Sequence, residues 1–431
     1  MTSSDALHSA PGSAAHHAAV GPRLSLMMFL EFAVWGAWAV LVAKHMANLG
    51  FSGTQINAVY LTTAIGAMLS PLIAGWIADR FLPNQMFTGA VHLAGGGLLF
   101  AAWMQTEFWG LWVMIFCYAI LYMPTIALTN AIAFHHMRDS RQFGNVRVFG
   151  TLGWIAVNWA LSLYLGYWET HAPGVSRVGD CLPAAGILSV VLGLYCFTLP
   201  HTPPSREARN PYAFLEALKL ASNPNFAALL IISFVVAIEL PFYYNLTFLF
   251  LTDAEAGVGL PESRANFAMS LGQVAEVILM LLVAPSLRYL GMRTTIFLGI
   301  LAWPVRYGIF ALGEPAWLVV SAQTLHGICY SFFFVGGMIA VERMSHKDIR
   351  ASAQGLIVFA TNGVGMFIGS LLAGWISDYF IDAEQRRQWA FIFVVPIVVT
   401  VLAAGAFWVL FDERRYQRET TEILAEDARA A

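Results

Sequence analysis

Long apolar segments alternate with short polar breaks along the chain. Each segment is about 20 residues long, which is the length that an α-helix needs to cross the hydrocarbon core of a bilayer. We place twelve spans near residues 24–45, 54–78, 85–104, 108–134, 145–168, 182–199, 223–252, 264–286, 293–313, 316–341, 351–378 and 388–411. A polar break near 200–222 divides them into two sets of six. The pattern therefore predicts an all-α integral membrane protein of twelve transmembrane helices in two six-helix bundles.

The composition agrees with a membrane protein and excludes several other classes. Of 431 residues, 58% are hydrophobic and only 11% are charged, whereas a soluble domain carries about 25% charged residues. No Gly-Lys pair occurs, so there is no phosphate-binding P-loop and no sign of coupling to ATP. The four cysteines lack metal-site spacing, and no basic patch indicates nucleic acid. We expect no cofactor, no metal and no nucleic-acid partner, and a lipid bilayer around the spans.

The polar segments set the expected domain boundaries and the orientation. We expect a disordered cytoplasmic tail (1–22), an N-terminal bundle (23–199), a cytoplasmic linker (200–222), a C-terminal bundle (223–411) and a second cytoplasmic tail (412–431). The first tail lacks the layout of a cleavable signal peptide. If both termini are cytoplasmic, 17 of the 23 Lys and Arg residues face the cytoplasm and five face the other side, while Arg306 lies within a span. This excess follows the positive-inside rule and favours an even number of spans.

The span near 264–286 carries an acid close to its middle. Glu276 lies one helical turn after Gln273, so the two side chains share a face. An isolated charge at this depth costs at least ~2.5 kcal/mol, so the residue must be neutral, paired or in contact with water. Because burial favours the protonated form of a carboxyl group, Glu276 can take up and release a proton. We predict that this face lines a polar cavity. Glu31, which shares a face with Trp35 and Trp38, either lines the same cavity or pairs with a neighbouring helix.

A second polar stripe lies near the start of the span at 145–168. Arg147, Thr151 and Trp154 share one face and offer a cation, a hydroxyl and an indole. Gly150 and Gly153 allow a neighbouring helix to approach closely. Arg147 is either a cavity residue or an ordinary cytoplasmic anchor whose side chain extends to the membrane surface.

Aromatic and amide side chains cluster in two spans of the second half. Pro241, Tyr244 and Asn245 follow one another closely in the seventh span, where the proline frees a backbone carbonyl. His326 and Tyr330 lie one turn apart in the tenth span. Rings with sparse polar groups suit a flat, uncharged ligand that can stack and form hydrogen bonds, although aromatic residues are also common in membrane cores.

A loop motif indicates the superfamily. Gly75-Trp-Ile-Ala-Asp79-Arg80 ends the second span and resembles the start of the Gly-x-x-x-Asp-Arg loop motif of the major facilitator superfamily, although the later Gly-Arg part is missing. In the alternative reading, Asp79 and Arg80 only cap a helix at the lipid surface. Residues 373–378 echo 74–79, and spans two and eleven are equivalent members of the three-helix repeats of this superfamily.

Several motifs in sequence order resemble one transporter family. They are Tyr122-Met-Pro-Thr125, Asn130, the run from Arg147 to Gly153, Thr198-Leu-Pro-His201, Glu239-Leu240, Gln273-Val-Ala-Glu276 and Arg350-Ala-Ser-Ala-Gln-Gly. From about Leu26 to Leu410 the chain resembles the nucleoside:proton symporter family of the major facilitator superfamily, which includes bacterial nucleoside and xanthosine permeases. The resemblance implies proton-coupled nucleoside import through alternating access in a bacterial cytoplasmic (inner) membrane, with the protein acting as a monomer.

The resemblance also implies a binding site. The substrate-binding residues would be Arg147, Thr151, Trp154, Tyr244, Asn245, Gln273, Glu276, His326 and Tyr330. Four of them, Arg147, Thr151, Gln273 and Glu276, match the family outright. Trp154 and Tyr330 each replace a phenylalanine, and His326 stands where a tyrosine is expected.

Other positions depart from the family pattern. Pro241 and Tyr244 replace a glutamine and an asparagine, for which Asn245 could stand in. Ser331 occupies the place of an aspartate, which removes one acid from the proton-coupling scheme. Glu31, where the family has a glutamine, could compensate, so the expected proton-coupling residues are Glu276 and Glu31.

Three other functions are alternatives to nucleoside import. The alternative transporter is a proton symporter for another small polar solute, such as a sugar. A membrane enzyme is disfavoured because no His-Glu-x-x-His, Gly-x-Ser-x-Gly or paired-cysteine site occurs. A transport-inactive sensor would usually carry a sizeable soluble output domain, for which neither expected tail is long enough.

Overall fold

The computed structural model describes residues 11–73, 82–137, 143–203, 213–347 and 349–429 of the chain. Within these residues the secondary structure is helical, apart from one isolated bridge between Ile381 and Arg387. The loop-motif residues Gly75, Asp79 and Arg80 lie outside the described residues, so their role stays a prediction.

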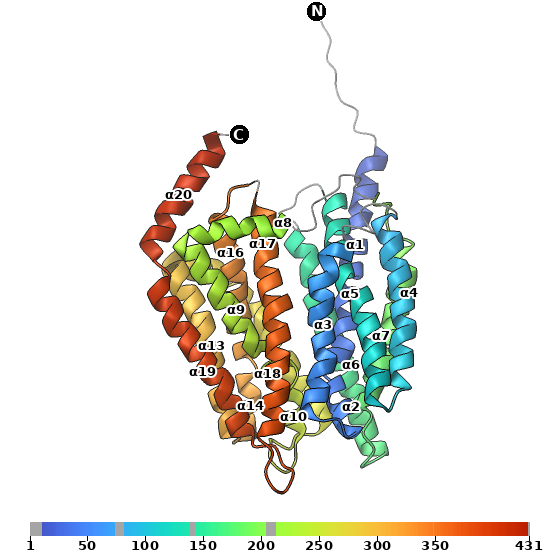
Figure 1. Cartoon of the computed structure of the whole chain (residues 1–431). Coiled ribbons are helices and arrows are strands. Elements are labelled where there is room, and N and C mark those ends of the chain that lie inside the picture. Colours follow the sequence, from blue (N-terminus) through green and yellow to red (C-terminus); the bar gives the residue numbers. More distant parts are fainter. Residues whose placement is uncertain (1–10, 74–81, 138–142, 204–212, 348, 430–431) are drawn as a thin grey trace, which may run out of the picture.

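The first half of the chain forms one group of helices, called the N-half (α1–α7). Its elements are α1 (Pro11–Ala39), α2 (Val42–Asn48), α3 (Gly53–Ile73), α4 (Asn84–Trp103), α5 (Phe108–His136), α6 (Phe143–His171), η3 (Val178–Asp180) and α7 (Cys181–Cys196). Helix α1 packs along α6, and α4 packs along α7. Figure 1 shows these helices together on one side of the molecule.

The second half forms the C-half (α9–α19) on the other side of Figure 1. Two short helices precede it, α8 (Ala213–Glu216) and η4 (Ala217–Ser222). Its elements are α9 (Pro224–Tyr244), α10 (Thr247–Thr252), α11 (Glu262–Met280), α12 (Val283–Tyr289), α13 (Gly291–Leu312), α14 (Ala316–Ala322), α15 (Leu325–Ile328), η5 (Cys329–Val335), α16 (Gly336–Arg343), α17 (Arg350–Val358), η6 (Phe359–Gly365), α18 (Met366–Tyr379) and α19 (Trp389–Leu410). A charged helix, α20 (Glu413–Arg429), follows.

The observed helices can be compared with the expected spans. Among the described residues, 10 helices are long and apolar enough to cross a membrane, and α11 with α12, bent by 53°, would make 11. The expected span at 54–78 corresponds to α3, whose continuation beyond Ile73 is not described. The all-helical membrane fold is confirmed, whereas the count of twelve stays a prediction. Helix α1 begins at Pro11, inside the segment expected to be a tail.

Local sequence explains where individual helices begin and how closely they pack. At the start of α9, the Asn223 side chain accepts hydrogen bonds from the backbone N–H groups of Asn225 and Phe226, with a proline in the first turn. At the contact between α1 and α6, a Cβ atom on Gly153 would collide with the Phe29 backbone carbonyl. The prediction that this glycine permits a close helix approach is confirmed.

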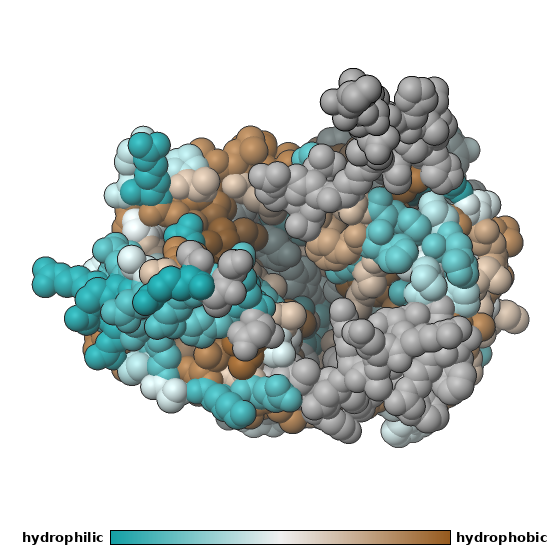
Figure 2. Space-filling model, turned by 90° about the horizontal axis from the view of Figure 1, so that it is seen from above, coloured by the Kyte–Doolittle hydropathy of each residue, from teal (hydrophilic) through white to brown (hydrophobic). Residues whose placement is uncertain are grey.

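The start of α1 and the end of α20 lie at the same end of the molecule in Figure 1, and we call the opposite end the far end. The two halves contact each other at the far end. Between the halves, α3 packs against α18 and α6 packs against α11. Seen from the end where α20 finishes, the surface is hollowed between the two halves (Figure 2). The hollow therefore opens at the end opposite the far end.

Polar side chains make the contacts between the halves from the far end toward the middle. Trp159 of α6 donates a hydrogen bond to Ser270 Oγ of α11 (2.9 Å). Asn266 Nδ2 of α11 donates to the Asn158 carbonyl (2.7 Å) and to Ser162 Oγ (3.0 Å), both of α6. These bonds close the molecule at the far end.

Candidate substrate and proton site

Glu276 and Arg147 are groups of opposite charge on the two halves of the molecule. Glu276 lies on α11 and Arg147 on α6, and the carboxyl and guanidinium groups interact electrostatically. The Glu276 side chain is 7% exposed, and its carboxyl group forms no hydrogen bond with any described residue. A carboxyl group with unused acceptor capacity, facing a cation on the other half, can bind a proton or a ligand hydroxyl.

Aromatic rings from three elements of the C-half lie near Glu276. The ring centroids of Tyr244 on α9 and His326 on α15 lie 5.9 Å apart, and those of His326 and Tyr330 on η5 lie 6.2 Å apart. Tyr244 and Tyr330 both interact electrostatically with Glu276, and Tyr330 also interacts with Arg147. Five of the sequence-predicted residues therefore lie in one group.

The N-half contributes a second group of rings. Arg147 Cζ lies 4.0 Å from the centroid of the Phe32 ring, a cation–π contact. The rings of Trp154 and Trp35 are 5.8 Å apart, and those of Trp35 and Tyr122 are 6.2 Å apart. Thr151 lies one turn after Arg147 on α6 and is half-buried. Arg147 is therefore engaged with neighbours from both halves, which disfavours the reading as a simple surface anchor.

Arg306 determines which nitrogen of the His326 ring carries the proton. Arg306 is fully buried on α13, and its Nη1 lies 3.3 Å from His326 Nδ1. Because a guanidinium group only donates hydrogen bonds, Nδ1 must accept, and the imidazole proton is then on Nε2. The Nε2 atom forms no hydrogen bond with a described residue. His326 therefore presents a hydrogen-bond donor. In the sequence this residue is marked only as an arginine within a span.

A buried polar network lies behind His326. The Tyr243 ring stacks on His326 with centroids 4.9 Å apart, and the Arg306 guanidinium lies 4.0 Å from the centroid of the Tyr243 ring. The Tyr307 hydroxyl donates to the Glu239 carboxylate, and Glu239 interacts electrostatically with Arg306. This network holds the imidazole in one orientation.

Three sequence-predicted residues stand apart from the rings. Gln273 is buried on α11, one turn before Glu276. Asn245 is buried, and its Nδ2 donates to Asn57 Oδ1 of α3 at 2.8 Å, so this amide already has a partner between the halves. Glu31 is buried inside the N-half and contacts His92 of α4. Of the two readings left open for Glu31, pairing with a neighbouring helix is the one that the structure has.

Two helix irregularities occur in the spans that carry His326 and Thr361. η5 and η6 are π-helical turns in the middle of these spans. π-Turns inside α-helices often occur at functional sites. Tyr330 and Ser331 lie on η5, and the Ser331 hydroxyl donates to the Glu276 backbone carbonyl (3.3 Å). No residue pattern used in sequence analysis predicted these turns.

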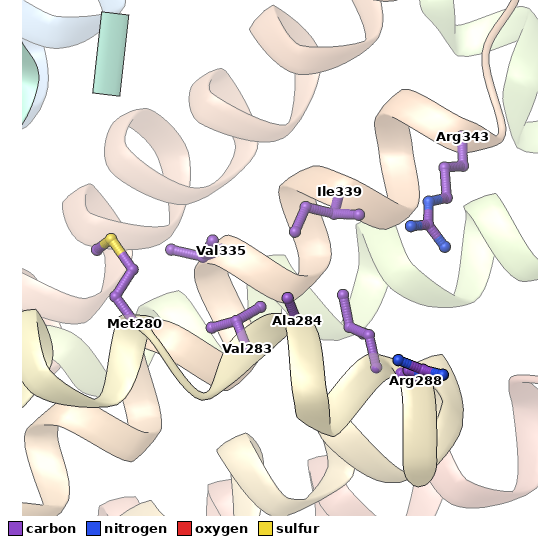
Figure 3. A pocket seen from close by; sticks show the side chains of 8 residues that line it. Met280, Val283, Ala284, Arg288, Val335, Ile339 and Arg343 are labelled. Atoms are coloured by element: carbon purple, nitrogen blue, oxygen red, sulfur yellow. The ribbon is translucent and has the colours of Figure 1, made fainter. Parts of the chain in front are cut away.

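A separate pocket of about 420 Å³ lies elsewhere in the C-half (Figure 3). Its walls are mainly apolar, and two guanidinium groups lie at one end; the lining residues are Met280, Val283, Ala284, Leu287, Arg288, Val335, Ile339 and Arg343. It contains no sequence-predicted site residue, so we place the candidate site at the Glu276 group.

Comparison with known proteins decides the family. A family model described as "Nucleoside H+ symporter" matches residues 19–416. The chain belongs to the nucleoside H+ symporter family. Within this family, the chain is similar to the putative nucleoside transporter YegT of Escherichia coli, with 33% identity covering 94% of this chain and 96% of the relative. It is also similar to the xanthosine permease of Escherichia coli, with 31% identity covering 94% and 98%.

Solved structures of two transporters are similar to this chain. The crystal structure of the nucleoside transporter NupG matches with a TM-score of 0.79 at 27% identity, covering 91% of this chain and 99% of that one. A D-xylose-proton symporter matches with a TM-score of 0.68 at 12% identity, covering 91% and 98%, which shows a shared fold. The resemblance inferred from sequence is thus confirmed. The protein is a multi-pass membrane transporter of the symporter family and not an enzyme.

Proposed function

We propose that this protein imports nucleosides together with protons, in the bacterial inner membrane, with both termini in the cytoplasm. The observation that carries the proposal is the Glu276 carboxyl group, which has no hydrogen-bond partner among the described residues and faces Arg147 between two groups of aromatic rings. Family membership supports the substrate class, and the excess of Arg and Lys on one side supports the orientation.

The ligand binds between the two halves in this proposal. Rings such as Trp154 and Tyr330 stack on the planar base, while Gln273 and Glu276 accept hydrogen bonds from ribose hydroxyl groups. Thr151 and Arg147 donate to ring or sugar oxygens. His326 Nε2–H adds a donor that requires an acceptor atom on the ligand.

Proton binding drives the cycle. Protonation of Glu276 removes its negative charge and so weakens its attraction to Arg147 of the other half, which allows the loaded carrier to reorient. The two halves then move relative to each other, and the site is exposed alternately on the two sides. A membrane potential of 100 mV contributes ~2.3 kcal/mol per charge moved, which corresponds to roughly fiftyfold accumulation per proton.

Uptake into proteoliposomes tests the proposal. Labelled uridine and adenosine should accumulate when an inward proton gradient is imposed and should only equilibrate without it. Nucleosides, free bases, ribose, hexoses and disaccharides are then compared as competitors. A hexose or disaccharide that competes better than every nucleoside would favour the alternative sugar symporter. Light scattering of the purified protein tests the proposed monomer.

A further inference from the structure

Glu31 and His92 form a buried pair inside the N-half. Glu31 lies on α1 with 0% exposure, and His92 lies on α4 with 1% exposure. Glu31 Oε2 and His92 Nε2 are 3.0 Å apart, which is a hydrogen-bond distance, so one proton lies between them. The other oxygen, Oε1, accepts from the Thr125 hydroxyl of α5 at 2.7 Å. Both carboxyl oxygens therefore have a partner within the N-half.

The opposite side of the imidazole contacts Ser189 of α7. Ser189 Oγ is 3.0 Å from His92 Nδ1 and 2.8 Å from the His92 backbone carbonyl oxygen. A hydroxyl group has one hydrogen to donate and two lone pairs with which to accept. If Ser189 donates to the carbonyl, it accepts from Nδ1–H. If its hydrogen turns to Nδ1, that nitrogen carries no proton.

Two protonation states fit the same atoms. When His92 carries a proton on Nδ1, the proton between Nε2 and Glu31 makes the pair neutral as a whole, whichever of the two atoms it is bonded to. When Ser189 donates to Nδ1, the imidazole has its single proton on Nε2 and Glu31 is a carboxylate. The second state holds one proton fewer, and the hydrogen bond at each ring nitrogen is kept in both. Rotation of one hydroxyl thus adapts the site to gain or loss of a proton.

The pair lies next to the wall of the substrate site. The Tyr122 hydroxyl donates to the Glu31 backbone carbonyl at 2.7 Å, and the Tyr122 ring contacts Trp35, which contacts Trp154. The ionisable groups that face Glu31 are His92 of α4, Tyr118 and Tyr122 of α5 and Cys196 of α7, and Arg147 of α6 acts on Tyr122. A change of charge at the pair therefore changes the electrostatic potential at the rings of the candidate site.

We propose that Glu31 and His92, assisted by Ser189, form a second proton-binding site, which takes up and releases one proton in each transport cycle. Its role in transport rests on the proposed function. The proton comes from water when the pair becomes accessible and returns to water on the other side of the membrane. Loss of the proton leaves a net negative charge among apolar helices, which is unfavourable while the site is sealed. Proton release is thereby linked to opening of the N-half to water.

The number of protons moved per nucleoside tests the proposal. It is measured in proteoliposomes from the membrane potential at which net uptake reverses, at a fixed nucleoside ratio and pH difference. Glu31→Gln keeps a group that can bond both Thr125 and His92 but cannot ionise, so the ratio should fall by one proton per nucleoside. Nucleoside exchange without a gradient should persist. Glu107→Gln, which removes an exposed acid of the same half, should leave the ratio unchanged.

A second measurement needs no substrate. Infrared difference spectra recorded across a pH titration should contain carboxyl and imidazole bands that disappear in Glu31→Gln. If that variant does not fold, the double variant Glu31→Gln with His92→Gln, in which two amides can bond each other and neither ionises, should give the same loss. An unchanged proton ratio, or the absence of a titrating band assigned to this pair, overturns the proposal. If the wild type moves no nucleoside at all, the proposed function fails, and the infrared result still decides whether the pair binds a proton.

Discussion

Asp378 holds the two halves together at the far end by capping a helix of the other half. It lies at the end of α18, where its Oδ1 accepts from the Gly53 backbone N–H (2.6 Å) and its Oδ2 from that of Thr54 (2.7 Å). The first N–H groups of α3 have no partner within their own helix, and a negative charge is favourable at that end. Asp378→Asn should therefore weaken the joined far end without touching the candidate site.

The expected size of the effect follows from these two bonds. A hydrogen bond to a charged group contributes ~1.5–3 kcal/mol, and the variant keeps one acceptor oxygen but replaces the other with a donor. A loss of about 2 kcal/mol changes the ratio of closed to open far ends by roughly thirtyfold. Both states retain their site residues, so the change appears as a shift in population.

Pulsed electron paramagnetic resonance can measure this shift. Spin labels at Ser52 and Tyr379, both exposed and on opposite halves, report the width of the far end. The longer-distance population should grow in Asp378→Asn. Asp382→Asn is the matched control, because Asp382 pairs with Arg386 within its own loop (3.0 Å). If the Asp378 variant gives the same distance distribution as the wild type and this control, the cap does not hold the far end.

Three further outcomes are expected at the candidate site. Glu276→Gln should remove the proton bound at the substrate site and so lower proton-driven accumulation while preserving exchange; a variant that reaches the wild-type accumulation in vesicles would show that Glu276 binds no coupled proton. A free base or ribose should compete at least tenfold more weakly than the intact nucleoside, because a buried group left unpaired costs ~1–3 kcal/mol; equal competition would refute the two-part site. His326→Gln, which can place an amide donor near Nε2, should bind within about threefold of wild type, whereas His326→Asn should bind roughly tenfold more weakly in titration calorimetry. Equal affinities of the two variants would contradict the donor role.

The fold could be predicted from sequence because its signals lie within single segments. The length of each apolar run follows from consecutive residues, as does the shared face of Gln273 and Glu276. The same holds for Gly153, which was predicted to allow the close approach of a neighbouring helix; the structure shows that this helix is α1. The family motifs placed Arg147 and Tyr330 in the same expected site, and the structure brings them together.

The contacts that sequence analysis missed join different helices. Helical spacing defines one face of one helix and carries no information about the helix opposite. Glu31 and His92 are 61 residues apart in the chain, and nothing near Glu31 indicates the imidazole. Likewise, Asn245 was expected to stand in for the family's amides at the ligand, and its amide bonds Asn57 of the other half. The π-helical turns depend on packing and had no local signal.

The hydrogen bonds that join the two halves at the far end set the free energy needed to open that end in each transport cycle. Some of these bonds join neutral groups, such as Trp159 with Ser270 and Asn245 with Asn57. Others end on the carboxylates of Asp378, Glu169 and Glu262. Water can replace each partner when the halves separate. Breaking a bond between neutral groups therefore costs only ~0.5–1.5 kcal/mol net, and breaking a bond to a charged group costs ~1.5–3 kcal/mol. An apolar contact between the halves would cost about 25 cal/mol for every Å² of apolar surface exposed on opening, with no compensation from water. Each of these bonds is thus of the order of the ~2.3 kcal/mol that one charge gains from 100 mV, and much stronger contacts would stall the carrier with its far end shut.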